Sequence, residues 1–133
     1  MYSMHHICIQ TDVYEASKDF YTNILGFEVL SETPNFHERD YNTWLIQGNT
    51  RIELQTYKKS QEPIAFNKDV NGIVHFCLYV KDLDADYERL KTLGFNNFKK
   101  KNGLDIYEVE GGKLLKIIAP EGTIIEIRDT IDL

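Results

Sequence analysis

Two stretches of the chain repeat the same order of hydrophobic and polar positions. Residues 6–10 and 75–79 both alternate apolar side chains with others, and each has a cysteine two residues after a histidine. This alternation predicts a half-buried strand. An acidic residue follows each strand, and then come apolar positions three and four residues apart, which predict an amphipathic helix. These positions are Val13, Ala16, Phe20 and Ile24 in the first copy and Leu83, Tyr87, Leu90 and Leu93 in the second.

Both predicted helices end at a Gly-Phe pair. Gly26 and Gly94 stand where a left-handed helix cap is expected. Further strands are expected near 27–32, 41–48 and 50–57 in the first copy, and near 95–101, 104–109 or 113–119, and 123–129 in the second. The pattern therefore predicts an α+β fold with two strand–helix–strand–strand–strand (βαβββ) repeats, at about 4–57 and 73–129. The polar stretch 58–72 is expected to link them within a single domain of residues 1–133.

Composition and charge narrow the classes of function. The 133 residues carry 15 Lys and Arg against 21 Asp and Glu, a net charge of −6, which disfavours nucleic acid and anionic membranes as partners. No apolar run approaches the ~20 residues of a membrane span, and the first residues lack the pattern of a signal peptide. The two cysteines, Cys8 and Cys77, predict no disulfide framework. A reducing cytoplasm is therefore the expected location.

The repeat places a histidine at the front and a glutamate at the back of each copy. His6 and Glu53 are 47 residues apart (53 − 6), and His75 and Glu126 are 51 apart (126 − 75). A single histidine or glutamate in a strand is usually just hydrogen-bonded. Two imidazoles and two carboxylates at matching positions instead favour one divalent metal ion, and the donor set suits Zn, Ni, Co, Mn or Fe.

Several short motifs span most of the chain, and together they point to a known family. They are His6-Ile7-Cys8-Ile9-Gln10, Ser17 to Phe27, Ile52-Glu53-Leu54, Gly72 to His75, Gly94-Phe95, and Ala119 to Ile127. In these motifs the chain resembles the vicinal oxygen chelate (VOC) superfamily, whose best-known member is glyoxalase I. Ala119 and Glu121 depart from the Asp-Pro-Asp-Gly turn usual in the family, although the proline and glycine remain.

The resemblance implies an architecture and a ligand set. Two βαβββ units would form an open, cup-shaped sheet of eight strands, built within one chain or across two, and the protein would be a homodimer. The metal ligands would be His6, Glu53, His75 and Glu126. His5 would point to the opposite face of its strand, as a surface or packing residue.

The resemblance also implies an activity, that of a glyoxalase I-like (lactoylglutathione lyase-like) isomerase or lyase. A small substrate, such as the hemithioacetal of a thiol and an aldehyde, would place two oxygens on the ion. Glu126 would move a proton through a metal-stabilised enediolate, with Glu53 as the alternate base. Strand alternation adds the substrate-facing candidates Gln10, Arg51, Tyr79 and Arg128. Gln10 replaces an arginine that helps hold glutathione in many bacterial members.

Two other functions stay open. One is a different VOC metal enzyme, a dioxygenase or a thiol-transferring antibiotic-resistance protein, although these typically use two histidines and one glutamate, so that Glu53 counts against them. The other is a non-catalytic protein that sequesters a small molecule, and the complete ligand set counts against that. Cys8 and Cys77 are expected to be buried packing residues. Residues 31–40 are either a lid over the cup or a surface hairpin.

Overall fold

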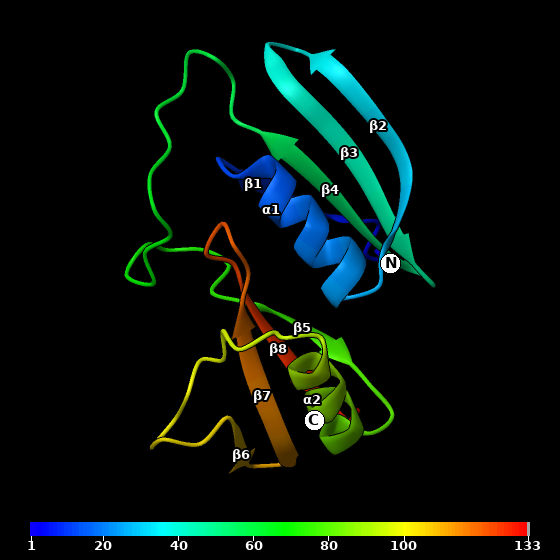
Figure 1. Ribbon diagram of the computed structural model, residues 1–133, viewed down its shortest axis with the longest axis vertical. Helices are drawn as coiled ribbons and strands as arrows, with labels where there is room; N and C mark the ends of the chain where they lie inside the picture. The colour runs from blue at the N-terminus through cyan, green and yellow to red at the C-terminus, as the bar shows by residue number, and fades with distance from the viewer. Residues whose placement is uncertain (133) are drawn as a thin grey trace. The chain divides into compact units, whose positions relative to one another are not determined.

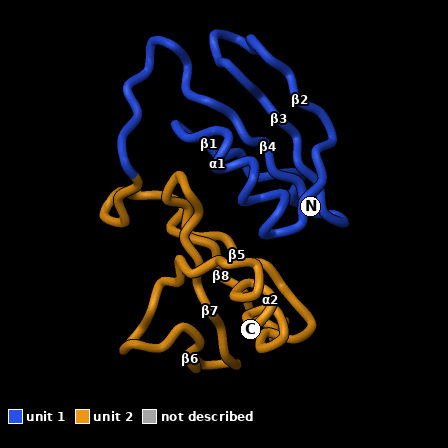
Figure 2. Tube along the Cα trace, viewed as in Figure 1, with its two compact units in different colours: residues 1–65 blue, residues 66–133 orange. Residues whose placement is uncertain are grey.

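The computed structural model describes residues 1–132 and consists of two compact units. The first unit is Met1–Ala65 and the second begins at Phe66 (Figure 2). Each unit has one four-stranded sheet, with strand orders β1-β4-β3-β2 and β5-β8-β7-β6. In both units the helix follows the first strand and three more strands follow the helix (Figure 1). The α+β class and the two βαβββ repeats are confirmed.

The first unit contains β1 (Ile7–Thr11), α1 (Tyr14–Asp19), the π-helical turn η1 (Phe20–Ile24), β2 (Glu28–Phe36), β3 (Arg39–Gln47) and β4 (Thr50–Thr56). β1 pairs with β4 in parallel, and β2, β3 and β4 pair antiparallel. Side chains alternate along β4, so that Ile52 and Leu54 are buried while Glu53 is only half-buried. One face of the sheet therefore carries the core, and we call the other its open face.

The helical face predicted for the first unit is largely wrong. Of Val13, Ala16, Phe20 and Ile24, only Phe20 is buried, and it is joined by Tyr14, Ser17 and Tyr21. Phe20 and Tyr21 both reach the core at the start of the π-helical turn. Val13 lies outside the helix, and its N–H donates to Thr11 Oγ1 at 3.0 Å.

Residues 31–40 form a hairpin. They are the end of β2 and the start of β3, joined by a turn at His37 and Glu38, both with positive φ (45° and 67°). Thr33 pairs with Asn42 and Phe36 with Arg39 across the two strands. This pairing shows that the segment is a hairpin of two paired strands.

The second unit contains β5 (Phe76–Tyr79), α2 (Leu83–Thr92), β6 (Ile106–Val109), β7 (Gly112–Ile118) and β8 (Ile124–Arg128). Asp82 caps α2 by accepting from the Ala85 N–H at 3.0 Å. Leu83 and Leu90 are buried as predicted, whereas Leu93 is 48% exposed. Gly94 has a φ of +81°, which matches the expected left-handed cap.

The strand predicted at 95–101 is wrong. The next strand was predicted at 104–109 or at 113–119, and the structure has a strand in each of these ranges, β6 and β7. Phe98 forms only an isolated bridge to Ile117. The ring of Phe98 packs edge to face on Phe95, at 5.4 Å between centroids, and on Tyr87 of α2, at 5.2 Å. Backbone hydrogen bonds from Lys99 N–H to the Lys116 oxygen, at 2.8 Å, and from Ile118 N–H to the Asn97 oxygen, at 3.0 Å, join the segment to β7 without making it a strand. No helix within residues 1–132 has the length and apolar character needed to cross a membrane.

Candidate metal and substrate site

In the first unit a histidine and a glutamate meet on the open face of the sheet. His6 directly precedes β1, and Glu53 lies in the middle of β4. Cys8 pairs with Glu53 in the parallel register, so the residues just before β1 start beside the carboxylate. His6 Nε2 lies 3.3 Å from Glu53 Oε2.

The second unit repeats this arrangement. His75 directly precedes β5, Cys77 pairs with Glu126 of β8, and His75 Nε2 lies 3.3 Å from Glu126 Oε2. The register and the separation of the two atoms are therefore the same in both units. The structure brings the four predicted ligands together as two pairs, one in each unit. Over residues 1–132, no three His, Cys, Asp or Glu side chains gather into a group that could hold a metal ion.

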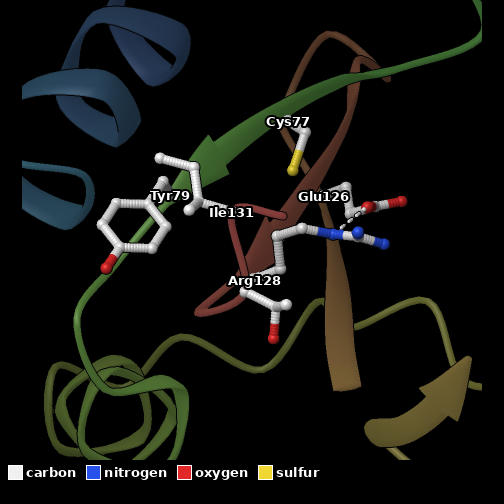
Figure 3. Close-up of a pocket in the computed structure, with 6 residues that line it drawn as sticks. Cys77, Tyr79, Glu126, Arg128 and Ile131 are labelled. Atoms are coloured by element: carbon white, nitrogen blue, oxygen red, sulfur yellow. Dashed lines mark hydrogen bonds and ion pairs between the residues drawn. The ribbon is translucent and has the colours of Figure 1, made fainter. Parts of the chain in front are cut away.

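A cavity of about 400 Å³ lies beside Glu126 in the second unit (Figure 3). Three predicted site residues, Tyr79, Glu126 and Arg128, line it. The Arg128 side chain turns back along β8, and its Nε donates to Glu126 Oε1 at 3.0 Å. Cys77, Thr130 and Ile131 complete the wall. The cavity is thus polar on the β8 side and opens beside one of the two His–Glu pairs.

The two glutamates have different neighbours. Glu126 is 7% exposed and lies near two cations, Arg128 and, at 3.9 Å, Lys116 Nζ. Opposite Glu53, the position equivalent to Lys116 is Trp44, whose ring lies 4.8 Å from that of His6. Neither Lys116 nor Trp44 is among the site residues predicted from the sequence. These two residues lie near the glutamates because of the strand register, which sets Trp44 of β3 opposite Glu53 and Lys116 of β7 opposite Glu126.

His5 is exposed, as expected, but it does not point away from the site. Its Nδ1 lies 2.9 Å from His6 Nδ1, and its ring lies 6.1 Å from the ring of Trp44. Both histidines precede the first residue of β1, so strand alternation does not yet apply to them. His5 therefore contacts a predicted ligand directly.

Three other residues predicted to bind the substrate, Gln10, Arg51 and Tyr79, lie within strands, which fix their positions. Gln10 of β1 and Arg51 of β4 lie on the open face of the first sheet, and both are half-buried. Tyr79 of β5 is 54% exposed. Arg39, which sequence analysis had assigned to a loop, donates from Nη1 to Gln10 Oε1 at 2.7 Å. The long side chain of Arg39 brings a positive charge to position 10, which the local sequence could not reveal.

Cys8 and Cys77 are free thiols at exposed residues, so the expectation of buried packing residues is wrong. Each lies on the open face opposite a glutamate. Partial burial of the sulfur and, next, the neighbouring carboxylate raise the pKa of Cys8 from 9.0 to about 11. The same causes, with Glu126 as the carboxylate, raise the pKa of Cys77 to about 11. Both thiols are consequently protonated at neutral pH and poor nucleophiles.

This predicts a slow reaction with thiol reagents. At pH 8 in metal-free protein, Cys8 should react with a disulfide reagent about tenfold more slowly than in protein denatured with guanidinium chloride, because the loss of thiolate outweighs the gain in nucleophilicity. Glu53→Gln should speed the reaction of Cys8 and leave Cys77 unchanged. Peptide mapping by mass spectrometry separates the two sites. Equal rates in folded and denatured protein would contradict the prediction.

Comparison with known proteins identifies the family. The model of the Glyoxalase/Bleomycin resistance protein/Dioxygenase superfamily matches residues 3–104, more than half of the chain. The chain is 33% identical over 93 residues to the uncharacterized protein YwkD of Bacillus subtilis (strain 168), covering 69% of this chain and 72% of YwkD. Both findings concern the sequence.

Solved structures share the fold over almost the full length. The crystal structure of SMU.1112c superposes with a TM-score of 0.76 at 25% identity, covering 96% of this chain and 98% of that one. The lactoylglutathione lyase from Agrobacterium tumefaciens superposes with a TM-score of 0.68 at 20% identity, covering 94% and 91%. The second likeness concerns the fold alone. On the sequence match, supported by these folds, the chain belongs to the Glyoxalase/Bleomycin resistance protein/Dioxygenase superfamily.

Proposed function

We propose that the chain is a metal-dependent VOC enzyme, a glyoxalase I-like lyase or isomerase that acts on a hemithioacetal-type substrate. The observation that carries this proposal is the duplicated His–Glu pair, with the same register and the same 3.3 Å separation in both units. The two units are copies of one another, and both copies keep a histidine and a glutamate in contact on the same strands.

The two pairs fit a divalent cation. Two ligand atoms at about 2.1 Å from one ion, at octahedral or tetrahedral angles, are roughly 3.0–3.4 Å apart. The observed 3.3 Å lies in that range. Imidazole nitrogen with carboxylate oxygen suits Zn, Ni, Co, Mn or Fe. The ligands in this proposal are His6, Glu53, His75 and Glu126, and the two pairs must meet within one chain or across two copies.

A bound cation would act as a Lewis acid and stabilise the negative charge that develops on two neighbouring substrate oxygens. The carboxylate of Glu126 is then the candidate for taking the proton next to the carbonyl, and Glu53 is the alternate. Lys116 and Arg128 hold Glu126 in place from two sides. Tyr79 and Arg128 offer hydroxyl and guanidinium groups to the substrate beside it. Gln10 and Arg51 extend the polar surface in the first unit.

Three further assignments belong to this proposal. Residues 1–133 form a single VOC domain, with repeats at about 4–57 and 73–129 and a linker at about 58–72. The protein is a homodimer that binds a small molecule and neither nucleic acid nor membrane. Its location is the cytoplasm, where a reducing environment suits the free thiols of Cys8 and Cys77.

Metal analysis tests the proposal. We expect about one ion for each complete set of two His–Glu pairs, and loss of that ion in His75→Ala. His37→Ala is the matched control, because His37 lies in the β2–β3 turn. Assays with methylglyoxal and several low-molecular-weight thiols then test the chemistry. Metal without turnover on any thiol would favour another VOC metal enzyme, and a protein that binds no metal would favour sequestration.

A further inference from the structure

Arg39 forms a fixed cationic group on the open face of the first unit. Its Nη1 donates to Gln10 Oε1 at 2.7 Å and to the Thr56 carbonyl oxygen at 2.6 Å. Gln55 Nε2 donates to the same Gln10 Oε1 at 3.3 Å, so that this oxygen accepts from both side chains. Two neutral oxygens, one from a side chain and one from the backbone, therefore hold a half-buried guanidinium in one orientation.

The positive charge of Arg39 is not neutralised by these partners. The ion pairs formed within residues 1–132 do not include Arg39. In the second unit, by contrast, Arg128 and Lys116 both face the carboxylate of Glu126. A guanidinium that is oriented by neutral groups and lacks a carboxylate partner keeps its attraction for an anion and has donors to offer it.

The position of Arg39 relates it to the His6–Glu53 pair. Gln10 and Gln55 stand opposite each other in the β1–β4 register, two residues beyond the pair Cys8 and Glu53. Two residues along a strand span about 7 Å and return to the same face. The guanidinium thus lies on the same face as Glu53. The spacing of about 7 Å between the two rows of the sheet is comparable to the length of a small substrate. All of these residues belong to the first unit.

The same row of the sheet contains a buried polar atom in need of a partner. Asn42 of β3 pairs with Gln55, so that amides from three strands lie side by side. Asn42 is 3% exposed, and its Oδ1 has no hydrogen-bond partner within the described residues. Such atoms are uncommon in folded proteins. The unpartnered atom is an acceptor, so it suits a donor group of a ligand, and the attraction of the row for an anion comes from Arg39.

We propose that Arg39 is a specificity-determining residue that binds an anionic group, carboxylate or phosphate, of the substrate, with Gln10 and Gln55 as its positioning residues. The inference rests on the proposed function, because it places this anion about 7 Å along the strand from a metal ligand. The substrate class is then a small molecule with two neighbouring oxygens for the ion and an anionic group at its far end.

Binding of hydroxamates to the Ni²⁺-loaded full chain tests the metal site and the anion site separately. The hydroxamate group offers two oxygens to the metal, and a carboxylate at the other end of the probe reports on Arg39. Isothermal titration calorimetry compares the monohydroxamates of succinate, glutarate and adipate with alkyl hydroxamates of the same length. At least one carboxylate-bearing probe should bind about tenfold more tightly than its alkyl partner. Arg39→Gln should remove that advantage and leave the alkyl probes unchanged. Arg39→Lys, which keeps the charge, should retain part of it.

Arg89→Gln, on the exposed side of α2, is the matched control and should behave as wild type. Equal binding of both probe series to the wild type would overturn the role of Arg39 and leave the metal site standing. Failure of every hydroxamate would instead count against the proposed function. In that case inorganic phosphate is titrated into metal-free protein by NMR. Saturable shifts of the Gln10 and Gln55 side-chain amides that vanish in Arg39→Gln would support the anion site, and no shifts would overturn it.

Discussion

Replacing Glu126 by glutamine is expected to lower turnover by about 10²–10⁴-fold, the usual loss when a positioned general base is removed. Glutamine keeps the size and one acceptor oxygen of the side chain, so it can still accept from Arg128, but it cannot take up a proton from the substrate. The steady-state turnover number and the metal content are measured together on the same preparation. A loss of rate at full metal content identifies a chemical role rather than a ligand role.

The comparison variants make this result decisive. Glu88→Gln, at an exposed position of α2, should leave turnover unchanged. Glu53→Gln tests the alternate base, whose ion-pair partner among the described residues is His6. If Glu126→Gln retains turnover and Glu53→Gln loses it, the two carboxylates have the opposite roles. If both variants retain turnover, proton transfer by these glutamates is wrong.

Ile125→Ala is expected to reduce the free energy of unfolding by about 2–5 kcal/mol. Ile125 is fully buried (0% exposed) in β8, next to Glu126 in the sequence, and pairs with Phe76 and Ile117 on the two neighbouring strands. Truncation to alanine removes apolar contacts from the core face of the sheet that carries Glu126 on its other face. Urea denaturation followed by circular dichroism measures the change.

The matched control is Ile131→Ala, which makes the same substitution at a position that is 75% exposed. It should change the free energy of unfolding by no more than about 0.5 kcal/mol. A similar, small loss for both isoleucines would mean that β8 does not alternate between core and site as described. Such a result would also weaken the placement of Glu126, because alternation along β8 sets the direction of its side chain.

Particular residues show how far the sequence reaches into the candidate site. His6, Glu53, His75 and Glu126 could be selected because they recur at equivalent places in two copies, and their pairing within each unit follows that selection. Arg39 could not be selected in the same way. Its contact with Gln10 joins residues 29 positions apart through a long, flexible side chain. A periodic pattern shows which face a residue occupies and says nothing of how far its side chain bends.

The sequence by itself determined the class of the fold, the duplication, the glycine caps and the candidate ligands, because these depend on local periodicity and on repeated residue types. Only the tertiary structure decided the strand register, which places Trp44 opposite Glu53 but Lys116 opposite Glu126. It also decided that Cys8 and Cys77 are exposed and that Phe20–Ile24 form a π-helical turn. Register and turn type are set by packing between residues distant in sequence. A local pattern of hydrophobic and polar positions does not contain this information.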